Sequence, residues 1–301
     1  MIKSPIEEVF DNHKLSTWRS CPLKGYYRHK KGFVIPSSHP VPALVYGDHV
    51  HKALDLMYQT NDVVQVIDFW MSTYSKATDD FDMADTTADK HSAEVGLNML
   101  TRYWNYWQES IKMMDLLACE QYFVLDLELD SVKTCSNCSD DHLKCIYCKG
   151  TRLVRRPFYC GRIDKVFIDK RTGQCVGMDH KTTSFLSGAT INAFKISQQF
   201  RGYVYFLMHH SEWKDIAAEY FYFDLILKTK TRYNADGQPF YRDTVLTQPE
   251  FLEEWLADTK AHVQEIRAMS TKINEHDGSL VLPRQNSDAC NSFGRLCTFY
   301  D

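Results

Sequence analysis

The hydrophobic residues of this chain follow two periods, and the period changes near Cys119. Before that point, apolar residues recur at the three- and four-residue spacing of amphipathic helices, in the segments 15–32, 42–59, 63–77 and roughly 85–115. Ser16 or Thr17 is a candidate N-cap of the first segment and Gly32 a stop signal, while Pro42 occupies a first-turn position in the second. The first third of the chain is therefore predicted to be helical.

From Cys119 onward the sequence alternates and is rich in strand-forming side chains. The predicted strands are 119–130, 155–169, 174–182 and 217–229, with a tight-turn signal at Gly173 between the second and the third. Helical periods return at 191–210 and 248–273, and the tail from Asn274 is loop-like.

This order of segments predicts an α/β fold, with a mixed central sheet flanked by helices and a helical N-terminal layer. We expect one domain over 1–301. Its expected parts are a helical portion at 1–118, a sheet core at 119–230 and a C-terminal helix with its tail at 248–301. A small cysteine-rich insertion is expected at 131–152.

Composition bounds the class of protein. With 44% hydrophobic and 25% charged residues, the chain has an ordinary globular composition. No apolar run is long enough for a membrane span, and Glu7 and Glu8 near the start are untypical of a secretory signal. We therefore expect a cytoplasmic protein without a membrane partner.

The net charge of −4 means that any contact with nucleic acid must be local. Two runs, 14–47 and 142–156, contain basic residues and no acid. They are either solvated faces or parts of a phosphate-binding groove. The candidate nucleic-acid contacts in these runs are Arg19, Arg28, Lys149, Arg152, Arg155 and Arg156. The aromatic residues Trp18, Tyr26 and Tyr27 are candidates to stack on a single strand.

Two acids and a lysine interrupt the strand-like runs in the middle of the chain. Asp164 and Asp179 lie on neighbouring predicted strands, and Lys181 follows two residues after Asp179, on the same face. Carboxylates are oxygen ligands suited to Mg²⁺ or Mn²⁺, and a lysine beside them can stabilise charge on a phosphate. By itself the pattern is weak, since a turn with ordinary surface charges would look the same.

Two helical pairs add to this pattern. Gly47 and His51 are four residues apart, as are Gln199 and Tyr203, so each pair shares a helix face. His51 could offer an imidazole nitrogen to a metal, although for His51 taken alone a hydrogen-bonded helix histidine is the simpler interpretation. Gln199 taken alone is an ordinary polar surface residue.

Together, these motifs resemble the RecB-like branch of the PD-(D/E)XK nucleases, which includes phage exonucleases and CRISPR-adaptation nucleases. The motifs are GxxxH at 47–51, GRID at 161–164, DHK at 179–181 and QFRGY at 199–203. The resemblance spans roughly 16–300 and implies a restriction-endonuclease-like core that hydrolyses nucleic-acid phosphodiesters with metal ions.

By motif match, the resemblance also implies roles for single residues. Mg²⁺ or Mn²⁺ would be held by His51, Asp164, Asp179 and the backbone carbonyl of His180. Lys181 would be catalytic, and Gln199 and Tyr203 would position the substrate or the lysine. The second acid is Asp where many relatives have Glu.

The expected function is that of a metal-dependent DNA exonuclease acting on single-stranded or end-bearing DNA, in replication, recombination or repair. A phage origin, and with it the cytoplasm of a bacterial host, fits the resemblance. Two alternatives stay open. One is a nucleic-acid-binding or assembly protein whose catalysis has lapsed, and the other is an RNA nuclease.

The central cysteines form two CxxC pairs, whose thiolates suit tetrahedral Zn²⁺; they are Cys135, Cys138, Cys145 and Cys148. A redox dithiol pair or an iron–sulfur cluster are alternatives. The insertion either touches nucleic acid, because a basic run overlaps it, or serves only as a structural staple.

Three further cysteines, Cys21, Cys290 and Cys297, resemble the ligands of the 4Fe–4S cluster that joins the chain ends in many RecB-like nucleases. That cluster takes one N-terminal and three C-terminal cysteines, and this tail contains two. Cys119 is expected at a strand start and would be a poor fourth ligand. Ordinary buried thiols are the other interpretation.

Overall fold

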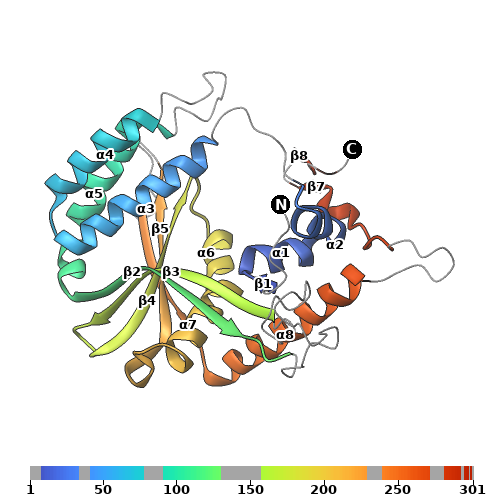
Figure 1. The fold of residues 1–301 in the computed structure, drawn as a ribbon. Helices are drawn as coiled ribbons and strands as arrows, with labels where there is room; N and C mark the ends of the chain where they lie inside the picture. Colours follow the sequence, from blue (N-terminus) through green and yellow to red (C-terminus); the bar gives the residue numbers. More distant parts are fainter. Residues whose placement is uncertain are drawn as a thin grey trace, which may run out of the picture. The chain divides into compact units, whose positions relative to one another are not determined.

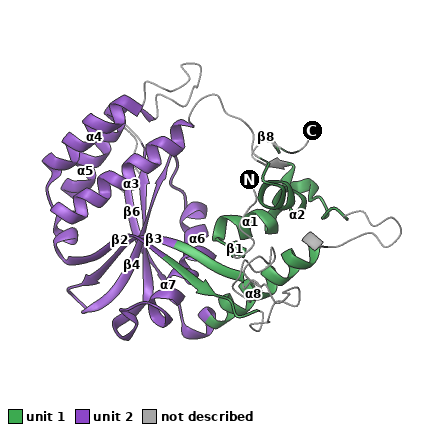
Figure 2. Ribbon diagram, viewed as in Figure 1, with its two compact units in different colours: residues 1–36, 123–161, 253–301 green, residues 37–122, 162–252 purple. Residues whose placement is uncertain are grey.

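The computed structural model describes residues 8–33, 41–77, 91–129, 157–228, 239–271, 281–292, 295–297 and 299. The chain divides into two compact units, shown in different colours in Figure 2. Unit 1 comprises 1–36, 123–161 and 253–301, and unit 2 comprises 37–122 and 162–252. The expected organisation as one domain, with its internal boundaries, remains a prediction. None of the described helices is long and apolar enough to span a membrane.

Three long helices open unit 2, as the helical period predicts (Figure 1). They are α3 (Pro42–Thr60), α4 (Val63–Ala77) and α5 (Ala93–Lys112). Pro42 is the first residue of α3, as predicted, because a proline lacks only an N–H that would be unpaired there. The described part of α5 begins later than expected, because the Ser92 side chain accepts a hydrogen bond from the Val95 N–H and caps the helix.

A mixed six-stranded sheet forms the centre of the fold, which confirms the predicted α/β class. Its strand order is β1-β3-β4-β5-β6, and β2 also pairs with β3. β3 and β4 are antiparallel, β4 and β5 parallel, and β5 and β6 antiparallel. The strands from β2 onward are β2 (Met114–Asp126), β3 (Pro157–Asp169), β4 (Gln174–Thr183), β5 (Ala217–Leu227) and β6 (Phe240–Leu246). Gly173 has φ 73°, a left-handed conformation that suits glycine in the β3–β4 turn.

Three predictions about the helices and strands are wrong: one strand starts earlier, one helix is divided and one strand was missed. β2 begins at Met114 rather than at Cys119, because helix-forming Leu and Ala residues obscure the alternation at its start. The predicted helix 191–210 is two helices, α6 (Gly188–Lys195) and α7 (Gln198–His209), separated where Ser197 takes an extended conformation. β6 was not predicted, since the charged pair Arg242 and Asp243 interrupts its apolar pattern.

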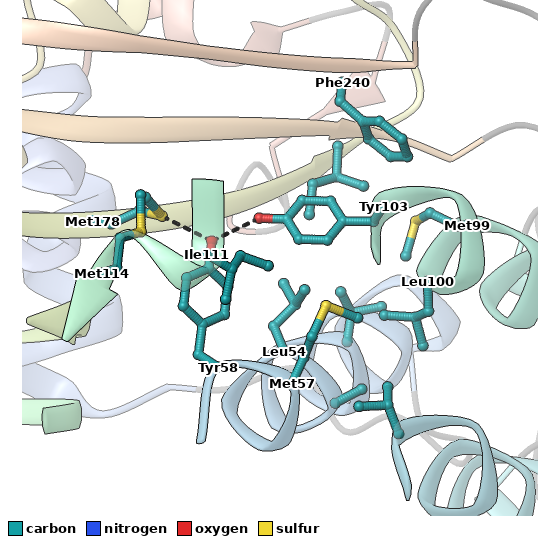
Figure 3. Packing of buried hydrophobic residues seen from close by; sticks show 14 of the residues in the cluster. Leu54, Met57, Tyr58, Met99, Leu100, Tyr103, Ile111, Met114, Met178 and Phe240 are labelled. Carbon is teal, nitrogen blue, oxygen red and sulfur yellow. Dashed lines mark hydrogen bonds between the residues drawn. The ribbon is translucent and has the colours of Figure 1, made fainter. Parts of the chain in front are cut away.

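Helices α3, α4 and α5 pack their apolar faces against one side of the sheet and form the main core of unit 2. Figure 3 shows part of this core, where the Tyr58 hydroxyl lies between Tyr103 and the sulfur of Met178. On the opposite side, Phe200 of α7 stacks on Phe221 and Phe223 of β5. The sheet of unit 2 is thus covered on both faces by helices, as expected for a mixed α/β fold.

Unit 1 contains short elements from both ends of the chain. Strand β1 (Glu8–Phe10) pairs in parallel with the start of β3, at Pro157–Tyr159. Most of α8 (Pro249–Thr271) belongs to this unit and confirms the predicted C-terminal helix. The tail is not loop-like throughout, because it forms a 3-10 turn (Ser287–Ala289) and the short strands β7 (Asn291–Ser292) and β8 (Arg295–Leu296).

The predicted helix over 15–32 is instead a series of helical segments. Helix α1 (Asn12–Ser20) begins earlier than expected, because Asp11, not Ser16 or Thr17, is its N-cap. Cys21 is extended, as a residue before proline usually is, and separates α1 from α2 (Pro22–Gly25). A π-helix (Tyr26–Lys31) follows and stops at Gly32, as predicted, with φ 73°.

The expectation that Trp18 and Tyr26 stack on nucleic acid is wrong. Each is 1% exposed and belongs to the core of unit 1, so neither ring can contact a substrate. Tyr27 is partly exposed, but its ring stacks on Phe33 and Phe299.

Candidate active site

A cavity of about 690 Å³ lies in unit 2, among α3, β2, β3, β4 and α7. The structure brings six of the predicted site residues together around it, although they come from four different elements. These residues are His51, Asp164, Asp179, Lys181, Gln199 and Tyr203.

Asp164 is the buried centre of this group, at 6% exposure in the middle of β3. One oxygen, Oδ2, accepts a hydrogen bond of 2.7 Å from the His180 N–H and lies 3.3 Å from Nδ1 of His51. Burial by itself raises the pKa of Asp164, but the contacts with His180 and His51 outweigh burial and hold it well below its ordinary value. Asp164 is therefore a carboxylate at neutral pH, although it is buried.

Asp179 and Lys181 line the cavity and form an ion pair with each other. Burial raises the pKa of Asp179 to about 6, against the lowering effect of Lys181. Burial lowers the pKa of Lys181, but the carboxylates of Asp179 and Asp164 raise it more strongly, to above its ordinary value. Lys181 is therefore a fixed positive charge beside the carboxylates, which can stabilise negative charge but is poorly suited to accept a proton.

Gln199 and Tyr203 face the cavity from the first turns of α7. The Gln199 side-chain amide donates a hydrogen bond of 2.6 Å to the Tyr203 hydroxyl, as the four-residue spacing allows. This hydrogen bond orients the Tyr203 hydroxyl on the α7 side of the cavity.

Glu120 is a candidate site residue that the sequence did not reveal. Its carboxylate, the His51 imidazole and the Asp164 carboxylate offer ligand atoms that all lie within 4.8 Å of one another. Glu120 also has a left-handed backbone, with φ 53°, which is rare for a non-glycine residue in a strand. In the sequence it is one polar residue of an alternating strand, so neither spacing nor burial distinguishes it.

The donor set of the cavity fits a hard divalent cation. Carboxylate oxygens are the preferred ligands of Mg²⁺ and Mn²⁺, and an imidazole nitrogen is acceptable to Mn²⁺. Glu120 and Asp164 supply such oxygens next to His51, and Asp179 supplies another in the same cavity. These residues would therefore hold the metal that the sequence motifs imply.

His180 points away from the cavity, although its neighbours in sequence line it. Its ring is fully buried, and Nε2 lies 3.3 Å from the Tyr103 hydroxyl. Alternation along β4 explains this arrangement, because His180 lies between Asp179 and Lys181 and must face the opposite side of the strand. The expected role of its backbone carbonyl as a metal ligand stays a prediction.

The remaining candidate residues lie elsewhere. Arg19 and Arg28 are exposed residues of unit 1. The cysteines of the expected zinc insertion and its basic residues fall outside the described residues, so the zinc site stays a prediction; they are Cys135, Cys138, Cys145, Cys148, Lys149, Arg152, Arg155 and Arg156.

The terminal cysteines approach one another within unit 1. The Asn286 N–H lies 3.4 Å from Sγ of Cys21, and the Cys290 thiol lies 3.5 Å from the carbonyl oxygen of the same asparagine. The Cys297 N–H donates to the Cys290 carbonyl oxygen at 2.7 Å. Cys119 lies inside β2, in unit 2. These contacts bring one N-terminal and two C-terminal cysteines to one region, while a fourth ligand for a cluster is not identified among the described residues.

Comparison with known proteins gives a family match over most of the chain. A family profile described as the PD-(D/E)XK nuclease superfamily matches residues 13–299. No curated protein sequence matches the chain significantly. A solved structure titled "Crystal structure of SSO0001" is similar at a TM-score of 0.29 and 10% identity, over 80% of this chain and 84% of that chain.

Proposed function

The chain belongs to the PD-(D/E)XK nuclease superfamily, and from this premise we propose that it is a metal-dependent DNA nuclease of the RecB-like branch. The proposed substrate is single-stranded or end-bearing DNA, degraded as an exonuclease in replication, recombination or repair. One observation carries the proposal: His51, Asp164, Asp179 and Lys181 line the same cavity. A lapsed enzyme would have no need to keep all four.

The proposed metal ligands are His51, Asp164 and Asp179, with Glu120 as a further ligand that the fold adds. A bound Mg²⁺ or Mn²⁺ would activate water and offset negative charge on the reacting phosphate. Asp164 is held as a carboxylate by its contacts with His180 and His51, so it is ready to bind a cation without losing a proton. His51 comes from α3, so a helix outside the sheet contributes a residue to the site.

Lys181 is proposed to stabilise the charge that develops on the phosphate. Its ammonium group forms an ion pair with Asp179, and its raised pKa keeps it protonated. The Tyr203 hydroxyl, fixed by Gln199, would position Lys181 or a substrate oxygen from the α7 side. The ordered motifs and the His51–Asp164 contact of 3.3 Å support placement in the RecB-like branch.

The test is degradation of end-labelled linear single-stranded DNA with Mg²⁺ or Mn²⁺, by wild type and by Lys181→Ala. Lys181→Ala should lose at least about 10²-fold in rate, the usual effect of removing one charge-stabilising group. Lys52→Ala is the matched control, because Lys52 also lines the cavity but pairs with Asp48 rather than with Asp179. Equal rates for wild type and Lys181→Ala would refute the assignment.

Three further substrates separate the alternatives. An exonuclease should degrade linear single strands and spare circular ones, whereas an endonuclease would cut both. Faster hydrolysis of RNA than of DNA would favour the RNA nuclease. Binding of DNA without degradation, in wild type as in Lys181→Ala, would favour the lapsed binding protein.

We also propose that the cysteines bind metals. The two CxxC pairs would hold Zn²⁺, and Cys21, Cys290 and Cys297 would contribute to a 4Fe–4S cluster whose fourth ligand is still to be found. Metal analysis of protein purified without oxygen distinguishes the cases. Zinc alone supports only the site in the insertion, and zinc with iron and sulfide supports both sites. Protein that contains neither zinc nor iron would contradict both proposals.

A further inference from the structure

Arg162 lies at the cavity but has no part in the roles assigned above. It precedes Asp164 by two residues on β3, so both side chains leave the same face of the strand. The Arg162 side chain is 66% exposed and lines the cavity together with Lys181. A guanidinium at this position can reach a substrate bound over the carboxylates.

The partner of Arg162 in the structure is Glu120. Nε of Arg162 lies 2.6 Å from Oε2 of Glu120, whose side chain is 29% exposed. This contact is made by Nε, and a guanidinium carries five N–H donors in a planar fork. The contact orients the fork while leaving it suited to pair with a second anion, such as a phosphate.

Glu120 has two competing uses in this arrangement. Its carboxylate belongs to the group of ligand atoms with His51 and Asp164, all within 4.8 Å of one another, and it also pairs with Arg162. Its backbone is left-handed, at φ 53°, which is unfavourable for a glutamate. A divalent cation held by Glu120 withdraws the negative charge that attracts Arg162, because both positive groups need the same carboxylate.

We propose that Arg162 binds a phosphate of the nucleic-acid substrate and that Glu120 controls this contact. With a divalent cation on Glu120, the guanidinium turns to the phosphate, so metal binding and substrate binding strengthen each other. The inference rests on the proposed nuclease function and assigns to Arg162 a phosphate contact that the sequence motifs did not.

The test measures binding of a fluorescein-labelled, hydrolysis-resistant phosphorothioate oligonucleotide by anisotropy, with and without Mg²⁺. Wild type should bind more tightly with Mg²⁺. Arg162→Ala should bind about tenfold more weakly than wild type with Mg²⁺, as expected for a lost charge-assisted contact. The slope of log affinity against log salt should also become shallower by about 0.7, the value for one phosphate contact on a single strand.

The matched control for Arg162→Ala is Lys52→Ala, which removes one positive charge from the same cavity. A structural role for Arg162 would weaken binding without changing the salt slope, and would lower the melting temperature. The inference is overturned if Arg162→Ala binds as tightly as Lys52→Ala, or if its salt slope equals that of wild type.

Glu120→Gln tests the control step. Without a carboxylate charge to hold Arg162, this variant should bind the oligonucleotide in the absence of Mg²⁺ more tightly than wild type does in its absence. Asp48→Asn is the matched control, since it removes one negative charge from the cavity at a residue that pairs with Lys52. Glu120→Gln that binds no more tightly than wild type in the absence of Mg²⁺, or that only matches Asp48→Asn, would overturn the role of Glu120.

The two proposals fail differently. If wild type does not degrade DNA with Mg²⁺ or Mn²⁺, the nuclease function fails. If wild type degrades DNA while Arg162→Ala keeps wild-type affinity, metal dependence and salt slope, only the present inference fails.

Discussion

His180 and Asp224 are register partners in the parallel strands β4 and β5, and Nε2 of His180 lies 3.7 Å from Oδ2 of Asp224. Asp224 is in turn the register partner of Arg242 on β6, whose Nη2 donates to the same oxygen at 2.7 Å. The Tyr103 hydroxyl completes the group by donating to Asp224 at 2.5 Å. The buried side chains of His180, Asp224 and Arg242 therefore form a row across β4, β5 and β6. The row ends at His180, whose N–H donates to Asp164 in the candidate site.

This row predicts a large loss of stability for Asp224→Asn. The change leaves the buried Arg242 charge without its carboxylate partner, and breaking a buried pair in this way costs about 3–5 kcal/mol. Urea unfolding measures it. The control is Asp243→Asn on the neighbouring strand β6, whose partly exposed pair with Lys195 should contribute far less to stability. Equal losses would show that the row does not stabilise the fold.

His180 should make the stability fall in weak acid. Burial lowers its pKa to about 4, from 6.5 in the unfolded chain. Between these values the unfolded state takes up a proton that the folded state excludes, so the contribution of His180 decreases stability as the pH falls from 6.5 to 4, by about 3 kcal/mol. Asp179, whose pKa is raised to about 6, contributes with the opposite sign over part of this range. The His180 contribution is therefore measured as the difference between the wild-type and His180→Asn profiles, both recorded in EDTA. The same change at the exposed His209 should leave the wild-type profile unaltered.

Substitutions at Glu120 should change the stability of the fold and the affinity for metal separately. Because its φ is 53°, Glu120→Gly should be about 1 kcal/mol more stable than Glu120→Ala, the reverse of the order at an ordinary strand position. Both variants should bind Mn²⁺ more weakly than wild type by titration calorimetry. An alanine variant as stable as the glycine variant would show that the left-handed conformation is not retained.

Gln199 and Tyr203 should act as one unit in catalysis. Tyr203→Phe removes the hydroxyl that accepts the 2.6 Å hydrogen bond from Gln199, and Gln199→Ala removes its donor. Each single variant should lose about tenfold in the rate of DNA hydrolysis, as for one lost hydrogen bond. The double variant should lose little more than either single variant, because the two side chains share one contact. If the two rate losses add in the double variant, Gln199 and Tyr203 act independently.

The core of unit 2 tolerates no side chain at Gly96. A Cβ there would lie 1.9 Å from the Trp70 ring, and overpacking of this kind costs about 1–3 kcal/mol. Gly96→Ala should therefore lower the melting temperature, although alanine favours helices. Gly188→Ala in α6, where a Cβ meets nothing within 4 Å, should leave it unchanged or raise it. A rise in both variants would mean that Trp70 moves aside without cost.

Local patterns of the sequence determined most of the elements of the fold. The apolar periods located α3, α4, α8 and the strands β3, β4 and β5 to within a few residues. The ordered motifs singled out His51, Asp164, Asp179 and Lys181 as candidates, and the structure places all four around one cavity. Two residues on a strand and four on a helix share a face whatever surrounds them, so spacing alone could pair Asp179 with Lys181 and Gln199 with Tyr203. Where elements broke, as at Ser197, or where a charged pair interrupted a strand, as in β6, the local signal was too weak.

Tertiary structure alone decided how these residues combine. No pattern within the chain indicates that Glu120 meets His51 and Asp164, that Arg162 pairs with Glu120, or that Arg242 is buried beside Asp224. Such contacts join strands and helices far apart in sequence, and their charges are set by burial and by neighbours that only folding supplies. The sequence therefore determined which side chains could carry the chemistry, and the packing of α3 and α7 around the sheet determined which of them meet.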